Sequence, residues 1–555
     1  MSGLKKAVPT KRFLQAKVLT KGESIMELNR RSFVKGAGLA GLAGAGMAAS
    51  ALAEEAVPQE SWMPEKWDAE ADAVIVGYGC AGPVAAIDLA KQGLTSLLIE
   101  KTDRENAGGN CSVSGGYVMQ CPDKAQPNTA EGIVTSTAGT VSDEYAQAIL
   151  PYINEAPEYL MDLGVELDTE SFPGLAFAHS DEYACGGMAF FKCLEAAVDA
   201  NADMIDVRYE TPALDLVQNP VTREVYGVKA GTPEAPVYLK ARRGVVIATG
   251  GFEADTAMVN AVFGVGINYP TIGAPSNTGD GTKMLMRAGV KVQTYSKCLE
   301  FAAMGFKRAS AEVGTGLTLP GYPTSTSYIF VNREGKRFMD ETATLQHSKD
   351  DDVFTYSRFK GGLHSGADNT GYPNMPAFMV FDEAHMQAGP IMSMDNMGWN
   401  WRGTYEWSED NQAELERGWI VKADTLEELA AKISGTDMWG NEVSIDPDGL
   451  AQQVKDYNEA CEAGADEEFG RTDLQSIGDG PYYAAEVSPV TLYTIGGASA
   501  SERAEALDWS DQPVARLYVA GNVGNPYVVH SPALVGATAY ARIAAEEIAQ
   551  LQPWE

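Results

Sequence analysis

The sequence lacks the common cysteine patterns of metal and disulfide chemistry. It contains seven cysteines in 555 residues, an odd number, and no two of them are spaced as C-x-x-C. Without that spacing, and without C-x-x-C-H, a disulfide framework, a zinc site, a standard iron–sulfur ligand run and an attached haem all lack support. We therefore predict buried thiols and no metal site; a cluster built from scattered cysteines is the open alternative.

The sequence is also poor in positive charge. It contains 42 Lys and Arg against 76 Asp and Glu, for a net charge of −34. The first 53 residues contain nine of these basic residues and only two acidic ones, so the remainder is more acidic still. Such an acidic surface argues against nucleic acid and anionic membranes as partners, and ordinary solvation is sufficient to explain it.

No stretch is apolar enough to predict an integral membrane span. The best candidate, residues 36–52, is rich in Gly and Ala and only weakly apolar. It follows Asn-Arg-Arg-Ser-Phe at 29–33 and precedes Ala-Leu-Ala at 51–53, a twin-arginine pattern with a cleavage-like site. We predict that residues 1–53 are a signal region. Its route would be twin-arginine export, to the periplasm or the outer face of the cytoplasmic membrane. Met26 marks a possible true start, and a disordered basic tail is the alternative.

One stretch, residues 71–101, contains a dinucleotide-binding motif. Its parts are a buried strand, a G-x-G-x-x-G turn, a helix, a second strand and an acid (73–76, 77–82, 83–92, 96–99 and Glu100). Gly77 permits a sharp turn, Gly79 permits close approach of a pyrophosphate, and Gly82 permits close helix packing. The free N–H groups at the helix start would bind the phosphates, and Glu100 stands near the spacing expected for a ribose ligand. A tight strand–helix turn without a ligand is the alternative.

A chain of this length predicts two or three domains, and its 57 glycines suit a turn-rich α/β protein. A second glycine-rich run lies at residues 108–117, where small side chains would let the backbone wrap a second phosphate and approach a flat ring. Further strands are predicted at 206–217, 225–229, 243–252 and 517–522, and helices at 186–202, from 277–281 onward, and at 532–549.

These motifs together resemble the flavoprotein family of fumarate reductase and succinate dehydrogenase, which includes 3-ketosteroid dehydrogenases. The resemblance rests on five ordered runs: the glycine turn with Glu100, Ser-Gly-Gly at 114–116, Ala-Thr-Gly-Gly-Phe at 248–252, Asn-Thr-Gly-Asp-Gly at 277–281 and Ala-Gly-Asn at 520–522. Residues 331–338 are similar to a segment of the family's capping domain. The resemblance to the family covers roughly residues 70–550 and implies that the dinucleotide is FAD, whereas the residues alone indicate only a dinucleotide.

The resemblance implies a set of FAD-binding residues. Glu100 would bind the adenosine ribose, Ala213 would meet adenine through its backbone, and Asp280, Asn522 and Ala539 would lie along the isoalloxazine and ribityl group. The predicted site comprises Gly77, Gly79, Ala81, Gly82, Glu100, Lys101, Asn110, Cys111, Ser114, Gly115, Gly116, Ala213, Thr249, Gly250, Asp280, Asn522 and Ala539.

The sequence departs from the family at the substrate anchors. The arginine that delivers the proton in fumarate reductases corresponds to Leu345, and the steroid enzymes have a tyrosine at that position. The arginine that clamps a carboxylate corresponds to Leu534, and a histidine pair corresponds to Leu492 and Tyr493. Leucines offer no donor for a carboxylate. A dicarboxylate is therefore a poor substrate, and a bulkier neutral or aromatic molecule is favoured.

Four residues beside the expected flavin segments are candidate proton donors: Tyr493, His530, Tyr117 and Tyr527. His530, one of only five histidines, and Tyr493, at the family histidine position, are the leading candidates. The alternatives are a structural histidine and tyrosines that only pack.

The predicted architecture is an α/β fold in which a Rossmann-like FAD domain, residues 70–300 and 475–555, carries an inserted α+β capping domain at 301–474. The favoured function is an exported FAD-dependent reductase of an activated C=C bond, an oxidoreductase acting on CH–CH bonds. Its electrons would come from a separate cytochrome or other redox protein, because the chain lacks a haem motif. A ketosteroid-type dehydrogenase, a dicarboxylate reductase and a non-catalytic flavin relay are the alternatives.

Overall fold

A computed structural model describes residues 62–119, 129–136, 141–168, 176–183, 185–263, 270–320, 323–341, 374–392, 404–437, 440–524 and 533–554. The predicted signal region, His530, Tyr527 and Leu345 lie outside these residues. Residues 64–555 form one packed unit, to which every element below belongs. Within the described residues, no helix is both long and apolar enough to cross a membrane.

The predicted βαβ unit forms the centre of the larger sheet. Strand β1 (Ala69–Val76) is followed by helix α3 (Ala81–Lys91) and strand β2 (Ser96–Ile99). β1 pairs in parallel with β2 on one side and with β9 (Pro236–Ile247) on the other. The last six residues of β1 are buried, which explains the continuous apolar run of the final four, residues 73–76. This part of the prediction is confirmed to within a few residues.

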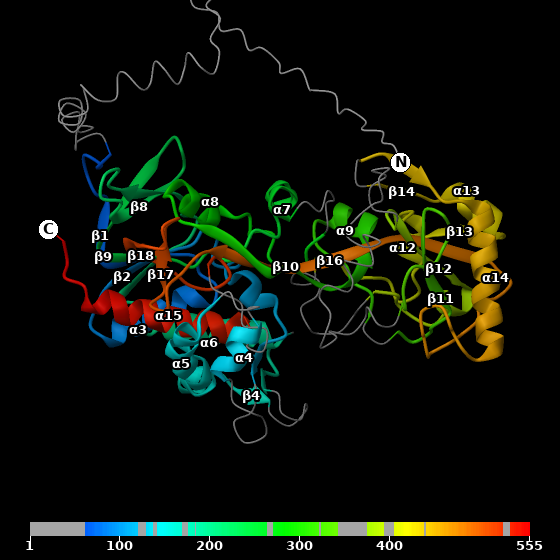
Figure 1. The fold of residues 1–555 in the computed structure, drawn as a ribbon, viewed down its shortest axis with the longest axis horizontal. Helices are drawn as coiled ribbons and strands as arrows, with labels where there is room; N and C mark the ends of the chain where they lie inside the picture. Colours follow the sequence, from blue (N-terminus) through cyan, green and yellow to red (C-terminus); the bar gives the residue numbers. More distant parts are fainter. Residues whose placement is uncertain are drawn as a thin grey trace, which may run out of the picture. The chain divides into compact units, whose positions relative to one another are not determined.

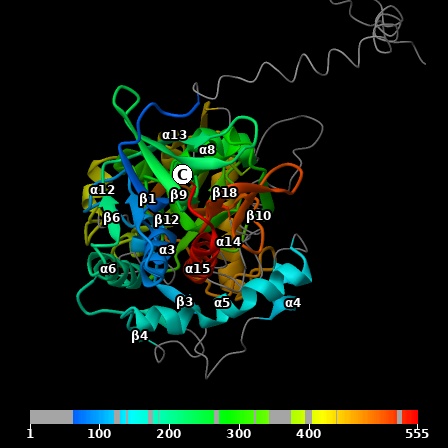
Figure 2. The ribbon, with the colours of Figure 1, turned by 90° about the vertical axis from the view of Figure 1, so that its left-hand side faces the viewer.

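The larger sheet has eight strands in the order β17-β18-β9-β1-β2-β6, with β8 pairing β9 and β7 pairing β8. The remaining bounds are β6 (Ile205–Arg208), β7 (Ala213–Gln218), β8 (Val225–Gly231), β17 (Glu505–Leu507) and β18 (Pro513–Val519). Helix α15 (Ala533–Gln550) packs along α3 and α5 (Asp143–Asp162), and α6 (Gly186–Asp199) contacts α3 (Figures 1 and 2). The predicted closing helix is α15.

The prediction of a single strand over residues 206–217 is wrong. The segment forms β6, parallel to β2, and then β7, antiparallel to β8. Between them Glu210 adopts a left-handed φ of 50°, and Pro212 has no N–H to donate to a ladder. The turn serves a purpose, because Thr211 N donates to Glu100 O (2.8 Å) and so anchors the start of β7 beside Glu100.

Short elements surround this sheet. They are a 3₁₀ helix η2 (Gly109–Val113), the small sheet of β3 (Tyr117–Met119), β4 (Leu167–Asp168) and β5 (Ala176–Ala178), and the helices α4 (Ala130–Ser136), α7 (Thr256–Phe263) and α8 (Asp280–Arg287). η2 and α8 begin where the glycine runs at 108–117 and 277–281 predicted turns.

A second, antiparallel sheet has the order β10-β16-β12-β11, with β13 also on β16. Its strands are β10 (Val292–Phe306), β11 (Tyr328–Asn332), β12 (Ala377–Asp382), β13 (Val421–Ala423) and β16 (Tyr482–Ala498). Around it lie α9 (Lys307–Val313), α11 (Glu383–Met386), α12 (Gln412–Glu416), α13 (Leu426–Lys432), α14 (Pro447–Ala463) and the hairpin of β14 (Ser434–Thr436) and β15 (Glu442–Ser444).

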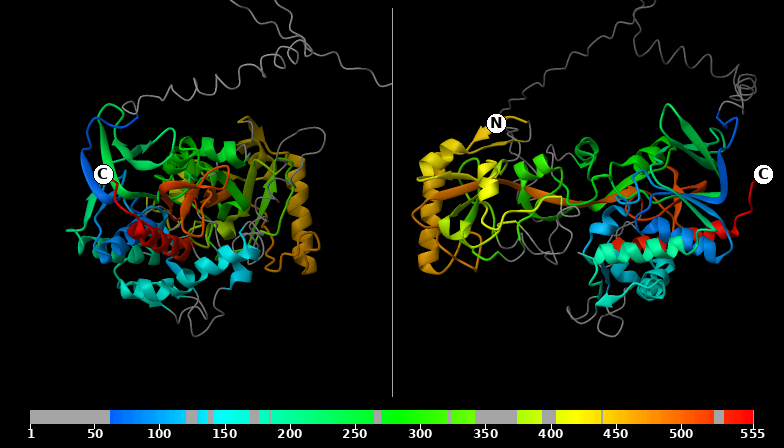
Figure 3. Two further views of the ribbon diagram at one scale, coloured as in Figure 1. Left: turned by 60° about the vertical axis from the view of Figure 1, so that its left-hand side comes forward. Right: turned by 180° about the vertical axis from the view of Figure 1, so that it is seen from behind.

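Strand β16 takes part in two pairings along its length. Its first half pairs with β12 and β13, and its second half pairs with β10 back to Ala498 (Figure 3). β10 itself runs through residue 300, where the capping domain was predicted to begin. The predicted boundaries at residues 300 and 474 remain predictions.

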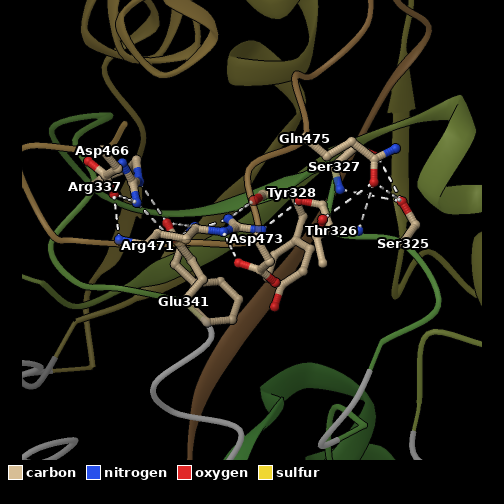
Figure 4. A network of polar contacts seen from close by, with 11 residues as sticks. Ser325, Thr326, Ser327, Tyr328, Arg337, Glu341, Asp466, Arg471, Asp473 and Gln475 are labelled. Atoms are coloured by element: carbon tan, nitrogen blue, oxygen red, sulfur yellow. Dashed lines mark hydrogen bonds and ion pairs between the residues drawn. The ribbon is translucent and has the colours of Figure 1, made fainter. Parts of the chain in front are cut away.

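The cap motif at residues 331–338 leads into a buried ion cluster (Figure 4). Arg337 donates two bonds to Glu341, both 2.8 Å, and one to Asp466 (2.9 Å). Arg471 donates to Glu341 (3.3 Å) and to the carbonyl of Tyr328 (2.6 Å). These charged side chains are at most 2% exposed, so each charge is stabilised by its partners rather than by water. The role of the motif that the structure shows is therefore structural.

Candidate flavin site

The glycine turn after β1 leaves space in front of one of its glycines. A Cβ on Gly82 would lie 2.0 Å from the carbonyl oxygen of Gly77, and a Cβ on Gly77 would lie 2.6 Å from the carbonyl oxygen of Ala248. Packing alone therefore requires these two glycines. A Cβ on Gly79 would meet only Gly108 O, at 3.7 Å, so its space is not taken by protein.

The start of α3 beside this space is not capped by a side chain. Its N-cap, Cys80, makes no side-chain capping bond, and the first turn contains Ala81 and Gly82. Uncapped N–H groups at a helix start, with a glycine that leaves room in front of them, form a site for a phosphate. The residues present fit the pyrophosphate of FAD, and Gly79, Ala81 and Gly82 are the ones that would contact it.

Glu100 is positioned by its own neighbours. One carboxylate oxygen accepts from Tyr78 N (2.9 Å), and the other accepts from the backbone N (2.9 Å) and hydroxyl (3.0 Å) of Thr102. These bonds fix the carboxylate at the end of β2 and leave lone pairs on each oxygen. Glu100 is half-buried, and Ala213 starts β7 two residues after the Thr211 contact. This arrangement fits a ribose diol beside an adenine.

The glycine run at 108–117 folds onto the start of α6. Gly187 N donates to Ser114 O (2.9 Å), and a Cβ on Gly116 would lie 2.5 Å from the carbonyl carbon of Gly186. Cys111 is buried, which raises the pKa of its thiol and keeps it protonated. A Cβ on Gly109 would meet nothing closer than 4.0 Å. The open side of this run is therefore at Gly109, beside Asn110, whereas Ser114, Gly115 and Gly116 pack against α6.

Lys101 and Asp280, both predicted cofactor residues, form an ion pair. The Lys101 ammonium contacts Asp280 at 2.6 Å and the Thr278 hydroxyl at 2.8 Å, and both charged side chains are about one third exposed. Asp280 is the first residue of α8, where a carboxylate is favoured by the helix dipole. The pair joins the end of β2 to α8.

A buried carboxylate that the sequence did not single out, Glu253, connects the predicted flavin residue Asn110 to two other segments. Its oxygens accept from Asn110 Nδ2 (2.7 Å), Asn277 Nδ2 (2.6 Å) and Thr494 N (3.3 Å). Its exposed fraction is 1%. Glu253 directly follows the Ala-Thr-Gly-Gly-Phe run, and an acid at the end of a small apolar motif was the signal that could have revealed it.

The turn after β18 meets the glycine turn and the last helix. A Cβ on Gly521 would lie 3.6 Å from Ala81 Cβ and 3.7 Å from Ala537 Cβ, which places the neighbouring Asn522 at this junction. On α15, Ala539 is fully buried in the core, whereas Gly536 has open space where a Cβ would stand. Thr249 and Gly250 follow β9, and a Cβ on Gly250 would lie 3.1 Å from the Asn277 side chain.

Of the four predicted proton donors, two lie in the described residues. Tyr493 is buried on β16, beside Thr494 and hence next to the Glu253 contacts. Tyr117 is on β3 with its ring 5.2 Å from that of Phe177, and burial raises the pKa of its hydroxyl. His530 and Tyr527 lie outside the described residues, so their roles remain predictions.

The structure thus brings most predicted cofactor residues to the carboxyl ends of β1, β2, β9 and β18, the edge where α/β sheets bind ligands. Among the predicted anchor positions in the described residues, Leu534 is buried in the first turn of α15, and Leu492 is partly buried on β16. The individual ligand roles remain predictions.

The sequence and the fold are similar to those of known flavoproteins. A family model described as FAD binding domain matches residues 72–531. The chain is 25% identical to a digoxin reductase of Eggerthella lenta over 542 residues, 88% of each chain. It is 25% identical to a vinyl phenol reductase of Lactiplantibacillus plantarum over 490 residues, 81% of this chain and 89% of the other. The fold is similar to a 3-ketosteroid Δ1-dehydrogenase structure from Sterolibacterium denitrificans, with a TM-score of 0.64, 20% identity and coverage of 86% and 99%.

Proposed function

We propose, because the chain belongs to the FAD binding domain family, that it is an exported reductase of an activated C=C bond in a neutral or aromatic substrate. The cofactor is FAD and the protein is an FAD-dependent oxidoreductase acting on CH–CH bonds, as the sequence predicted. The predicted relationship to fumarate reductase and steroid dehydrogenase flavoproteins and the α/β fold are likewise confirmed. Substrate, direction and cellular location are the parts that we propose.

The single observation that supports a neutral substrate is the apolar character of the anchor positions. Leu534 is 7% exposed, and its carbonyl accepts from the Thr538 hydroxyl (2.8 Å) within α15. A dicarboxylate needs paired or charge-assisted donors, which leucine cannot supply. One similar protein is named for vinyl phenol, which carries a C=C bond on an aromatic ring, and this agrees with the same substrate class.

The chain's own residues supply binding, orientation and a proton. When bound, FAD supplies hydride exchange at its ring. The turn at Gly79 and the α3 N-terminus bind the phosphates, and Glu100 binds the ribose. Tyr493, on a strand joined to the flavin site through Thr494, is the described residue best placed to donate the proton that completes reduction of a C=C bond.

Export and the electron donor complete the proposal. The twin-arginine pattern at 29–33 supports export of a folded, FAD-loaded protein, and the missing haem motif supports a separate redox protein as the donor. A fusion of residues 1–53 to a reporter, with Arg30→Lys and Arg31→Lys together as the control, tests export: only the natural pair should transport the reporter.

The decisive experiment is anaerobic reoxidation. The purified, chemically reduced protein is mixed with a vinyl phenol, a neutral enone or fumarate, and the oxidised protein is mixed with a saturated 3-ketosteroid. The oxidised-flavin absorbance band is followed in each mixture. We expect rapid reoxidation by the vinyl phenol or the enone and none by fumarate. Rapid reoxidation by fumarate would show that the anchor assignments at Leu345 and Leu534 are wrong. Bleaching of the oxidised protein by the ketosteroid, without any reoxidation by alkenes, would instead show a dehydrogenase.

A further inference from the structure

We propose that Glu253 is a positioning residue whose buried negative charge lowers the reduction potential of the bound FAD and so favours reduction of the substrate. The inference rests on FAD binding and deepens the proposed function, because it assigns a structural cause to the direction of the reaction. No sequence motif predicted this role.

Glu253 lies where three separate segments meet. Asn110 comes from η2 in the glycine run at 108–117, Asn277 from the turn before α8, and Thr494 from β16. Two of these, the η2 run and the 277–281 turn, contain residues predicted to bind FAD. A Cβ on Gly251 would lie 2.5 Å from the Glu253 carboxylate, so the backbone of the Thr-Gly-Gly turn passes directly over it.

Glu253 forms no ion pair within the part of the chain that the structure describes. Among the described residues no Lys, Arg or His forms an ion pair with it, and its bonds come from amide, hydroxyl and backbone donors. Burial raises the pKa of Glu253, whereas the bonds from Asn277, Asn110 and Thr494 lower it, and burial is the larger effect. Burial therefore favours the protonated form at low pH. The amide N–H groups pointing at its oxygens stabilise the ionised form that the carboxyl group reaches at higher pH, so the potential is measured at pH 8.

Such a charge acts on whatever lies against Asn110. In a low-dielectric interior an ionised carboxylate produces a strong local field, because solvent does not screen it and no described residue supplies a counterion. Reduction of FAD adds electrons to its ring, so a nearby fixed negative charge disfavours the reduced form. A flavin held at a lower potential gives electrons more readily to an acceptor, which suits a reductase.

The same carboxylate connects the flavin run to the proton donor. Asn110 Oδ1 accepts from Ala274 N (2.6 Å), and its Nδ2 reaches Leu492 O (3.4 Å) as well as Glu253. Thr494, on the other side of Tyr493, donates its N–H and its hydroxyl to Glu253. Tyr493 therefore lies between Leu492, which is bonded to Asn110, and Thr494, which is bonded to Glu253. The carboxylate that would act on the flavin potential is thus two bonded contacts or fewer from each neighbour of the proposed proton donor.

The test is the midpoint potential of bound FAD at pH 8, measured by equilibration with a reference dye. We expect Glu253→Gln to raise the potential by at least the equivalent of a tenfold change in the reduction equilibrium, about 30 mV for a two-electron couple. Glu414→Gln is the matched control, because Glu414, on α12, is also fully buried. Among the described residues its carboxylate accepts from the neutral donors Tyr405 and Ser408. The midpoint potential of FAD in the Glu414→Gln protein should equal that in the unchanged protein.

A charge-swap variant separates electrostatics from structural damage and covers the case in which Glu253→Gln does not fold. Glu253→Gln combined with Asn277→Asp moves the carboxylate across the 2.6 Å contact and keeps the hydrogen bond. We expect its potential to return to that of the unchanged protein. An unshifted potential in Glu253→Gln, or a raised potential in the swap, would overturn the proposal. If the potential shifts as expected but no alkene reoxidises the protein, the inference on Glu253 stands and the proposed substrate class fails.

Discussion

Substitution of two glycines in the same turn should separate folding from FAD binding. At Gly82 a Cβ would lie 2.0 Å from the carbonyl oxygen of Gly77, closer than real Cβ contacts come. At Gly79 the nearest atom, Gly108 O, is 3.7 Å away, an ordinary contact, and Gly79 does not have a left-handed φ. Gly82→Ala therefore perturbs the protein, and Gly79→Ala perturbs only what lies in front of the turn.

The two substitutions change different quantities: Gly82→Ala lowers the stability of the protein, and Gly79→Ala lowers its affinity for FAD. Gly82→Ala requires the backbone at Gly77 to move by at least about 1 Å, and we expect a loss of unfolding free energy of about 3 kcal/mol, the upper part of the range for overpacking. Gly79→Ala should leave the protein without FAD as stable or slightly more stable, by about 0.4–1 kcal/mol, because alanine restricts the unfolded chain. Its methyl group would displace the pyrophosphate from charge-assisted backbone bonds worth about 1.5–3 kcal/mol each. The affinity for FAD should fall at least about 100-fold, or ~3 kcal/mol.

Both quantities can be measured on the same preparations. Thermal unfolding of the FAD-free protein reports stability, and titration with FAD, followed by flavin fluorescence, reports affinity. The reasoning is refuted if Gly79→Ala binds FAD as tightly as the unchanged protein, since the phosphate would then not pass in front of Gly79. It is equally refuted if Gly79→Ala destabilises the FAD-free protein as much as Gly82→Ala does.

Three further outcomes follow from particular side chains. Burial lowers the pKa of His385 to about 4 against an attractive Asp382, so its folded pKa is depressed. The contribution of neutral His385 to the free energy of unfolding is complete above pH ~6.5 and falls by about 3 kcal/mol as the pH falls to 4. His385→Phe should therefore reduce the difference in unfolding free energy between pH 7 and pH 4.5, measured by urea titration. The same difference in the variant and in the unchanged protein would contradict this prediction. Arg471→Met should cost about 3–5 kcal/mol of unfolding free energy, because it removes one guanidinium partner of the buried Glu341 and the donor to the Tyr328 carbonyl. The exposed Lys455→Met should cost less than about 1 kcal/mol in the same urea titration. Tyr493→Phe should slow alkene-driven reoxidation about 100-fold or more at unchanged FAD content, and an unchanged rate would exclude Tyr493 as the proton donor.

Local sequence was sufficient where chemistry and geometry are both local. The βαβ unit, with Glu100 at the end of β2, could be predicted because a buried strand, a glycine turn and a helix follow one another within thirty-one residues. Gly77 and Gly82 are required by contacts within this unit and with the neighbouring β9, so their spacing alone identified the turn. The same holds for α15, whose small residues pack closely on α3.

Tertiary structure decided the features that depend on distant residues. Whether residues 206–217 form one strand or two depended on a bond from Thr211 to Glu100, more than 100 positions earlier. Glu253 resembles any acid after a strand until Asn110, Asn277 and Thr494 converge on it. Composition and periodicity record what a residue can do, whereas its burial and its hydrogen-bond partners arise only when separate segments pack together. The sequence by itself determined the dinucleotide motif and predicted leucines at the positions of the family's carboxylate anchors. Only the folded chain determined that Glu253 lies against Asn110, Asn277 and Thr494, because these contacts join segments far apart in the sequence.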